Sequence, residues 1–224
     1  MSYLLNIHTA TETAIINIAK DEEVLGTFIN YDTNQHAALL HTAIRELLET
    51  NNIDIKKLNA VGVSSGPGSY TGIRVGLATA KGLCYALNIP LVTFNSLELM
   101  ALSAAKFVKD DKALYCPMID ARRMEVFTAV YSYTLQELIP PSARILDENS
   151  FADILNINKV YFSGNGNAKF KSISKSVNSF FINEPISTES LNSISWKKFK
   201  INDFENIPYM QPLYIKDFFT ILKK

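Results

Sequence analysis

The chain has 224 residues, of which 47% are hydrophobic and 20% are charged, a composition typical of a globular protein with a sizeable core. Lys and Arg balance Asp and Glu at 22 each, so no overall field attracts nucleic acid, and RNA contact would need a partner or a local patch. No apolar run reaches the ~18 residues that cross a bilayer, and the start "MSYLLNIHTATE" lacks the basic region of a signal peptide, so we expect a cytoplasmic protein without membrane contact.

The first half of the chain alternates strand and helix signals. Three apolar runs separated by polar turns predict strands at residues 4–7, 14–18 and 24–29. Helical spacing of apolar residues predicts a helix over 34–50, with Thr33 or Asn34 as its cap. Then follow a strand at 60–64, a glycine-rich loop, a helix over 71–87, the strand "LVTF" and a further helix capped by Asn95 or Ser96.

Residues 115–131 repeat the strand, turn, strand layout of the N-terminus, so that Asp120 falls where His8 falls in the first copy. A chain that runs through strands and helices in this order and then restarts favours two similar halves, which we place at 1–105 and 106–224. This is the layout of a duplicated ribonuclease-H-like domain, as in actin, sugar kinases and Hsp70 ATPases. The expected fold class is α/β: two lobes of the actin-like ATPase superfamily, with mixed sheets and flanking helices.

The second half gives weaker signals. "SFADILNI" is predicted to be helical, "KVYFSGNGNAKF" to be a strand that enters a loop, and residues 171–206 to be irregular. Acids and aromatics interrupt the lysines of this half, which favours a solvated surface over an RNA-binding stripe: Lys169, Lys171, Lys175, Lys197, Lys198 and Lys200. Cys84 and Cys116 have no partner motif and are expected to be free thiols.

The glycine-rich loop has the general layout of a phosphate-binding loop but fits neither common pattern. A Walker loop needs a glycine followed by Lys five positions after its first glycine, and Thr71 and Ile73 stand there instead. A dinucleotide loop needs a glycine at 71, where the chain has Thr. An anion site at the helix N-terminus is a further alternative that these patterns do not exclude. The candidate loop residues are Gly66, Pro67, Gly68, Ser69, Tyr70, Thr71 and Arg74, with Ser69 and Thr71 as possible helix caps.

Small residues recur on the helix that follows the loop. Gly72, Gly76, Ala80 and Cys84 are spaced by four, so they form one stripe. A glycine inside a helix costs up to ~1 kcal/mol relative to alanine, so the stripe indicates close approach of another backbone. That backbone is either the protein's own sheet or another subunit.

The motifs "GPGSYTGIRVGLATAKGL", "IPLVTFNSLELMA" and "IDARRMEVFTAVY" together resemble the TsaB (YeaZ) family of bacterial tRNA modification, and "IHTATE" and "QPLYIKD" resemble its two ends. The resemblance implies an actin-like fold without catalytic activity or cofactor. It implies a homodimer when alone, and a complex with the catalytic subunit TsaD and the ATPase TsaE. With a synthase, this complex adds a threonylcarbamoyl group to the adenosine beside the anticodon of ANN-decoding tRNAs, so that this chain contacts tRNA only indirectly.

The resemblance also implies that the first two helices, at about 34–50 and 71–87, contact the partners. The predicted interface residues are Leu40, Ile44, Gly72, Ile73, Gly76 and Ala80. One position departs from the family pattern, because His8 stands where the family usually has Asp. In catalytic relatives that acid helps to hold the metal–phosphate group, so its loss argues further against nucleotide hydrolysis.

Two enzymatic alternatives remain. In an actin-like ATPase, glycine-bearing phosphate turns would begin each half, but these turns read "HTATE" and "DARRM", and Asp120 is expected to pair with Arg122 or Arg123. "SGNGNA" could imitate an adenosine-binding loop, although a plain turn is favoured.

The second alternative is a metallopeptidase that uses His36 and His41. These residues are five apart, which places them about 140° from each other on a helix, whereas metal-binding pairs stand three or four apart. Ser64, Ser65 and Ser69 lie near the loop, but none is set in a G-x-S-x-G motif.

Overall fold

The computed structural model describes residues 1–32 and 35–216 and contains two five-stranded sheets. The first sheet has the order β3-β2-β1-β4-β5, and the second has the order β10-β9-β6-β7-β8. In chain order the strands of the first sheet are Tyr3–His8, Ala14–Lys20, Glu23–Asn30, Leu58–Gly66 and Leu91–Asn95. Those of the second are Leu114–Asp120, Glu125–Tyr131, Glu137–Ile145, Val160–Ser163 and Ser179–Phe181.

The two sheets share one topology, because each starts with its central strand and adds the next two antiparallel on one side. The fourth and fifth strands of each sheet are parallel and lie on the other side. His8 and Asp120 each end the central strand of their sheet. This confirms the predicted α/β class with duplicated ribonuclease-H-like, actin-like lobes.

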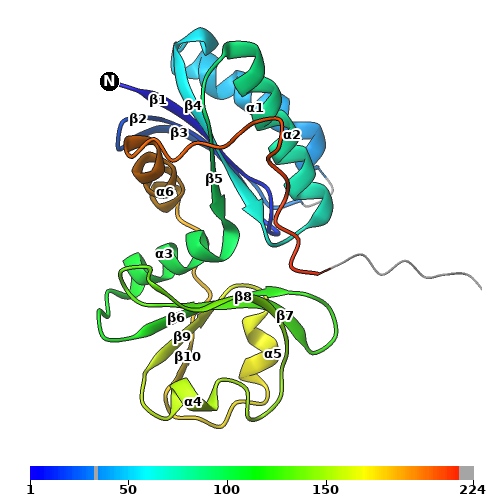
Figure 1. The fold of residues 1–224 in the computed structure, drawn as a ribbon, viewed down its shortest axis with the longest axis vertical. Coiled ribbons are helices and arrows are strands. Elements are labelled where there is room, and N and C mark those ends of the chain that lie inside the picture. The colour runs from blue at the N-terminus through cyan, green and yellow to red at the C-terminus, as the bar shows by residue number, and fades with distance from the viewer. Residues whose placement is uncertain (33–34, 217–224) are drawn as a thin grey trace, which may run out of the picture.

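Helices cover both faces of the first sheet (Figure 1). Helices α1 (His36–Thr50) and α2 (Tyr70–Leu87) pack on one face, and α6 (Thr188–Lys200) packs on the other. Helix α3 (Ser96–Val108) lies between the two sheets and contacts strands of both. The remaining helices are the short η1 (Ile55–Lys57), α4 (Ala152–Leu155) and α5 (Asn167–Lys171). Within the described residues, no helix has the length and apolarity needed to cross a membrane.

Most predicted elements of the first half are present, with shifted ends. Helix α1 begins at His36 after Gln35, whereas the predicted caps Thr33 and Asn34 lie outside the described residues. Ser69 caps α2, because its hydroxyl accepts a hydrogen bond from the N–H of Gly72. Asn95 caps α3 through the N–H of Leu97 at 2.8 Å. The other cap candidates, Thr71 and Ser96, lie inside the helices.

Four elements of the second half were missed, namely β8, α5, β10 and α6. Strand β8 contains Pro140 and Pro141, which cannot donate ladder hydrogen bonds, and it therefore lies at the edge of its sheet. Helix α6 lies in the stretch predicted to be irregular, and it packs on the first sheet although it belongs to the second half of the chain. The division of the chain into lobes at residue 105 stays a prediction.

Buried asparagines fix α6 on the first sheet. The Asn6 amide donates to the side-chain oxygens of Asn17 at 2.8 Å and Asn192 at 3.2 Å, and Asn192 in turn donates to the carbonyl of Asp21. Losing the partner of a buried polar group costs free energy, so these hydrogen bonds stabilise the helix in this position. The approach is close, since a Cβ atom on Gly62 would lie 2.2 Å from the Ser195 hydroxyl.

Each lobe has its own apolar core. Cys84 lies in the first core, between β4 and α2, and Cys116 lies in the second, with both side chains fully buried. Neither forms a disulfide, which agrees with the prediction of free thiols. Burial raises the pKa of each thiol to about 12, because the thiolate would be desolvated.

Candidate interaction surface

The turn after β1 fills the space at the N-terminus of α2. The N–H of Ser69 donates to the carbonyl oxygen of Ala10 at 2.7 Å. A Cβ atom on Gly68 would lie 1.9 Å from this oxygen, and one on Gly72 would lie 1.9 Å from the carbonyl oxygen of Thr9. No side chain fits at such distances, so glycine is needed for backbone approach. The loop's glycines therefore serve packing inside the protein, and the chain's own carbonyl oxygens occupy part of the helix end where an anion would bind.

The small-residue stripe of α2 packs on the protein's own sheet. The Thr9 hydroxyl donates to the carbonyl of Gly72 at 2.7 Å, and a Cβ atom on Gly76 would lie 2.4 Å from this hydroxyl. The same Cβ atom would contact Ile7 of β1 and Val63 of β4. The stripe thus serves the close approach of β1 to α2.

The structure buries the predicted interface residues. Gly72 and Gly76 are buried, and Ile73, Ala80, Leu40 and Ile44 are each at most 5% exposed, all within one lobe. These six residues pack inside the lobe, and their contact with a partner stays a prediction. The helical periodicity correctly indicated a close contact, but the contact is internal.

The opposite face of α2 carries a second stripe of small residues. Ala78, Gly82 and Ala86 are exposed and again spaced by four, two positions out of step with the buried stripe. Two residues correspond to about 200° around a helix, so the second stripe faces solvent. Nothing lies within 4 Å of the place where a Gly82 side chain would begin. The fold itself therefore gives no reason for a glycine at this position, and Tyr85 beside it is 83% exposed.

The C-terminal segment crosses α2 and the loop (Figure 1). The N–H of Leu213 donates to the carbonyl of Ser65 at 2.8 Å, and Lys81 donates to the carbonyl of Met210. Residues after α6 thus hold the glycine loop in place.

An arginine–aromatic cluster stands at the start of α2. Arg74 donates to the Tyr214 hydroxyl at 2.7 Å, and its guanidinium lies 3.8 Å from the centre of the Tyr70 ring. Of the other loop residues, Pro67 is buried and follows a cis peptide bond. Thr71 is exposed in the first helical turn.

Asp120 pairs with a residue that the sequence did not point to. Its carboxylate accepts from Lys169 at 2.7 Å and from the backbone N–H of Arg122, whereas no ion pair joins it to either arginine side chain among the described residues. Partial desolvation acts to raise the pKa of Asp120, but these hydrogen bonds outweigh it and hold the pKa below its usual value. The predicted arginine pair is wrong, because Lys169 of α5 binds the carboxylate at the end of the central strand β6.

The histidines lie in separate places. His8 is fully buried at the end of β1, with its Nε2 atom 2.9 Å from the Thr11 hydroxyl. His41 is exposed on α1, and His36 is the first residue of that helix. The described part of the chain contains no group of three or more His, Cys, Asp or Glu residues placed to hold a metal ion.

Comparison with known proteins gives the family. The family described as "TsaD: tRNA N6-adenosine threonylcarbamoyltransferase" matches residues 23–199. The tRNA threonylcarbamoyladenosine biosynthesis protein TsaB of Buchnera aphidicola subsp. Baizongia pistaciae is 32% identical over 195 residues, which cover 82% of this chain and 85% of the relative. The chain belongs to the TsaB (YeaZ) family.

A second relative and a solved structure give further matches. TsaB of Bacillus subtilis is 33% identical over 140 residues, 61% of this chain but only 59% of the relative's length. The structure of YeaZ from Pseudomonas aeruginosa superposes with a TM-score of 0.75 at 22% identity, covering 96% of this chain and all of that one, which supports the fold.

Proposed function

We propose that this chain is the non-catalytic partner and activator subunit of a complex with a TsaD-like catalytic subunit and a TsaE-like ATPase. The complex adds the threonylcarbamoyl group to the adenosine beside the anticodon of ANN-decoding tRNAs. The observation that carries the proposal is the match to TsaB over 82% of the chain, because that relative is named for threonylcarbamoyladenosine biosynthesis. In this complex the chain contacts protein, and tRNA is reached through the partner.

The site geometry supports an accessory role. Carbonyl oxygens of Thr9 and Ala10 lie against the α2 terminus, the end that a phosphate would need. Asp120 is engaged by Lys169, and the described histidines form no ligand set. These features speak against the ATPase and metallopeptidase alternatives.

We place the partner surface on the exposed face of α2 and the adjoining face of α1. The stripe of Ala78, Gly82 and Ala86 would let a partner helix approach closely, as small residues do at helix contacts. A glycine in a helix costs about 1 kcal/mol, and Gly82 has no internal contact that explains it. A contact with a partner helix would explain the glycine. The same face would form the homodimer when the partner is absent.

Reconstitution tests the proposal. Transcribed tRNA, threonylcarbamoyl-adenylate synthase, and TsaD- and TsaE-like subunits from the same cells are combined with and without this chain, and modified adenosine is measured by mass spectrometry of nucleosides. We expect modification only when the chain is present. Modification that is equally fast without it would refute the activator role. Metal-dependent ATP hydrolysis by the chain alone, lost in Asp120→Asn, would instead establish an ATPase.

Two substitutions at one position test the surface. Gly82→Arg should fold, since its side chain reaches water, but should weaken binding to the TsaD-like subunit more than about a hundredfold by desolvating a charge. Gly82→Ala should retain binding to within about tenfold and serves as the matched control. Full binding and modification by Gly82→Arg would place the interface elsewhere on the chain.

A further inference from the structure

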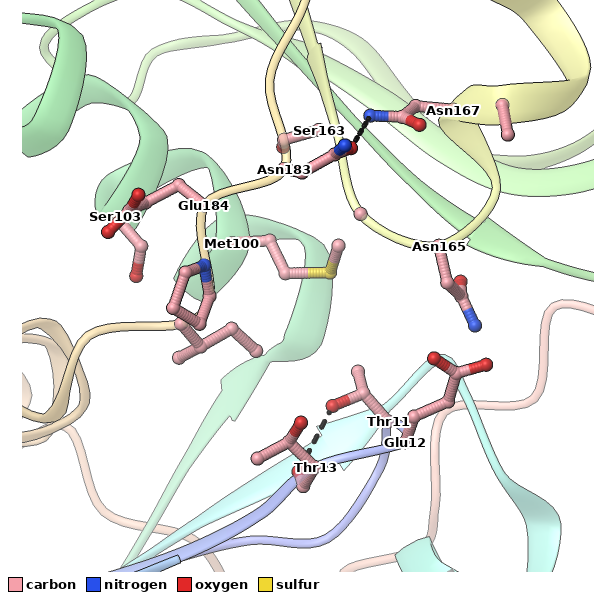
Figure 2. Close-up of a pocket in the computed structure, with 14 residues that line it drawn as sticks. Thr11, Glu12, Thr13, Met100, Ser103, Ser163, Asn165, Asn167, Asn183 and Glu184 are labelled. Carbon is pink, nitrogen blue, oxygen red and sulfur yellow. Dashed lines mark hydrogen bonds between the residues drawn. The ribbon is translucent and has the colours of Figure 1, made fainter. Parts of the chain in front are cut away.

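A cavity of about 350 Å³ lies between the two lobes. Its walls come from the turn at 11–13 after β1, from α3, from the loop at 163–168 after β9, and from the connection at 183–186 that leads to α6. Figure 2 shows Glu12 and Asn165 extending toward one another from the two lobes. Its volume lies at the lower end of the range for small-molecule sites, which begins at roughly 300 Å³.

The lining carries negative charge only. Glu12 and Glu184 both line the cavity, while Lys, Arg and His are absent from the lining that the structure describes. Neither carboxylate has an ion-pair partner among the described residues. A nucleotide would bring several phosphate charges beside these carboxylates with no cation to offset them, so the cavity is electrostatically opposed to a nucleotide.

The amide groups in the wall are partly used by the protein. The Asn165 oxygen accepts from the N–H of Asp120 at 2.8 Å, and the Asn167 amide donates to the carbonyls of Phe162 and Ile182 and to the side-chain oxygen of Asn183. The two carboxylates are the charged acceptors of the lining. They favour a ligand that carries hydrogen-bond donors.

The wall of the cavity is tightly packed at Gly164. It also includes a buried hydroxyl without a partner among the described residues. Gly164 has a φ of +87°, and a Cβ atom there would lie 2.3 Å from the Met100 methyl group and 2.5 Å from the Met118 carbonyl, so the glycines of "SGNGNA" serve tight packing. Ser163 is 4% exposed, lines the cavity, and its hydroxyl has no partner among the described residues. Such a group is costly unless a ligand or water satisfies it.

We propose that this cavity binds a small organic cation, specifically a primary diamine with a short apolar body. One ammonium group would donate to the carboxylate of Glu12 and the other to that of Glu184, which Figure 2 shows on opposite sides of the cavity, in charge-assisted hydrogen bonds. The apolar body would pack against Met100 and Ile186, which supply the apolar part of the wall. The site draws its walls from both lobes, so an occupant would fix their relative position.

Calorimetric titration with 1,4-diaminobutane at low ionic strength tests the proposal. The neutral isostere 1,4-butanediol and Mg·ATP are titrated in parallel. We expect saturable binding of the diamine, with the diol at least about tenfold weaker. Glu12→Gln and Glu184→Gln each remove one charge at constant shape and should weaken diamine binding about tenfold. Glu23→Gln removes the same charge from an exposed strand residue and should change the affinity for the diamine less than about twofold.

Three outcomes would overturn the proposal. Equal binding of diol and diamine would mean that the charge is irrelevant. An equal loss in Glu23→Gln and the two cavity variants would mean diffuse attraction to the surface. Binding of Mg·ATP in place of the diamine, abolished by changes in the cavity, would make the cavity a nucleotide site.

Discussion

Gly76→Ala and Gly82→Ala form a matched pair that tests which face of α2 is internal. The two positions lie in one helix, and the added methyl group is the same. At Gly82 nothing lies within 4 Å of the new Cβ atom, so only helix propensity acts, and the free energy of unfolding should rise by about 0.8–1 kcal/mol.

At Gly76 the new Cβ atom would lie 2.4 Å from the Thr9 hydroxyl, which donates to the Gly72 carbonyl and is buried. The hydroxyl must rotate away and lose its buried hydrogen bond, at roughly 1–3 kcal/mol, and overpacking adds a cost of similar size. The propensity gain of about 1 kcal/mol offsets only part of this. We expect a net loss of about 1–3 kcal/mol.

The assay is equilibrium unfolding in urea followed by circular dichroism, with the m-value checked for each variant. A Thr9→Ala background supplies the internal control, because it removes the clashing oxygen. The cost of Gly76→Ala should then shrink, giving a coupling of at least about 0.5 kcal/mol. A stabilised Gly76→Ala variant, or strict additivity with Thr9→Ala, would refute the internal packing of the stripe.

Four further predictions concern stability and reactivity. Ser163→Ala should raise the free energy of unfolding by about 1 kcal/mol, measured in urea, because a buried hydroxyl without a described partner is removed; a loss of stability would mean that the hydroxyl is satisfied. Asn192→Ala should cost about 2–3 kcal/mol in the same assay, since Asn6 loses an acceptor and a buried void forms, while a change below about 0.5 kcal/mol would show that the network does not hold α6. Cys84 and Cys116 should resist a thiol reagent at pH 8 until the chain unfolds, and then react as two thiols. Because their pKa values rise on folding from 9.0 to about 12, the unfolded chain loses these protons first, and stability should fall by about 1.4 kcal/mol per pH unit per thiol over that window. A flat alkaline stability curve would contradict this.

The sequence by itself determined much about this protein. Apolar runs and helical spacing located the strands and helices of the first half, and the repeated layout at 115–131 predicted the duplicated topology. Counting positions in "GPGSYTG" excluded the two common phosphate-loop patterns, and the long motif around it led to the family. These inferences depend on local spacing, which the sequence records directly.

Only the tertiary structure decided which surfaces meet. Gly76 and Gly82 are both helical glycines in small-residue stripes, and spacing alone cannot tell that the first lies against Thr9 while the second faces open space. The sequence likewise could not show that α6 returns to the first sheet through buried asparagines, or that Lys169 reaches Asp120 from 49 residues away. Periodicity fixes which side chains share a face of an element, but the partner of that face comes from distant parts of the chain, and only the folded structure brings them together.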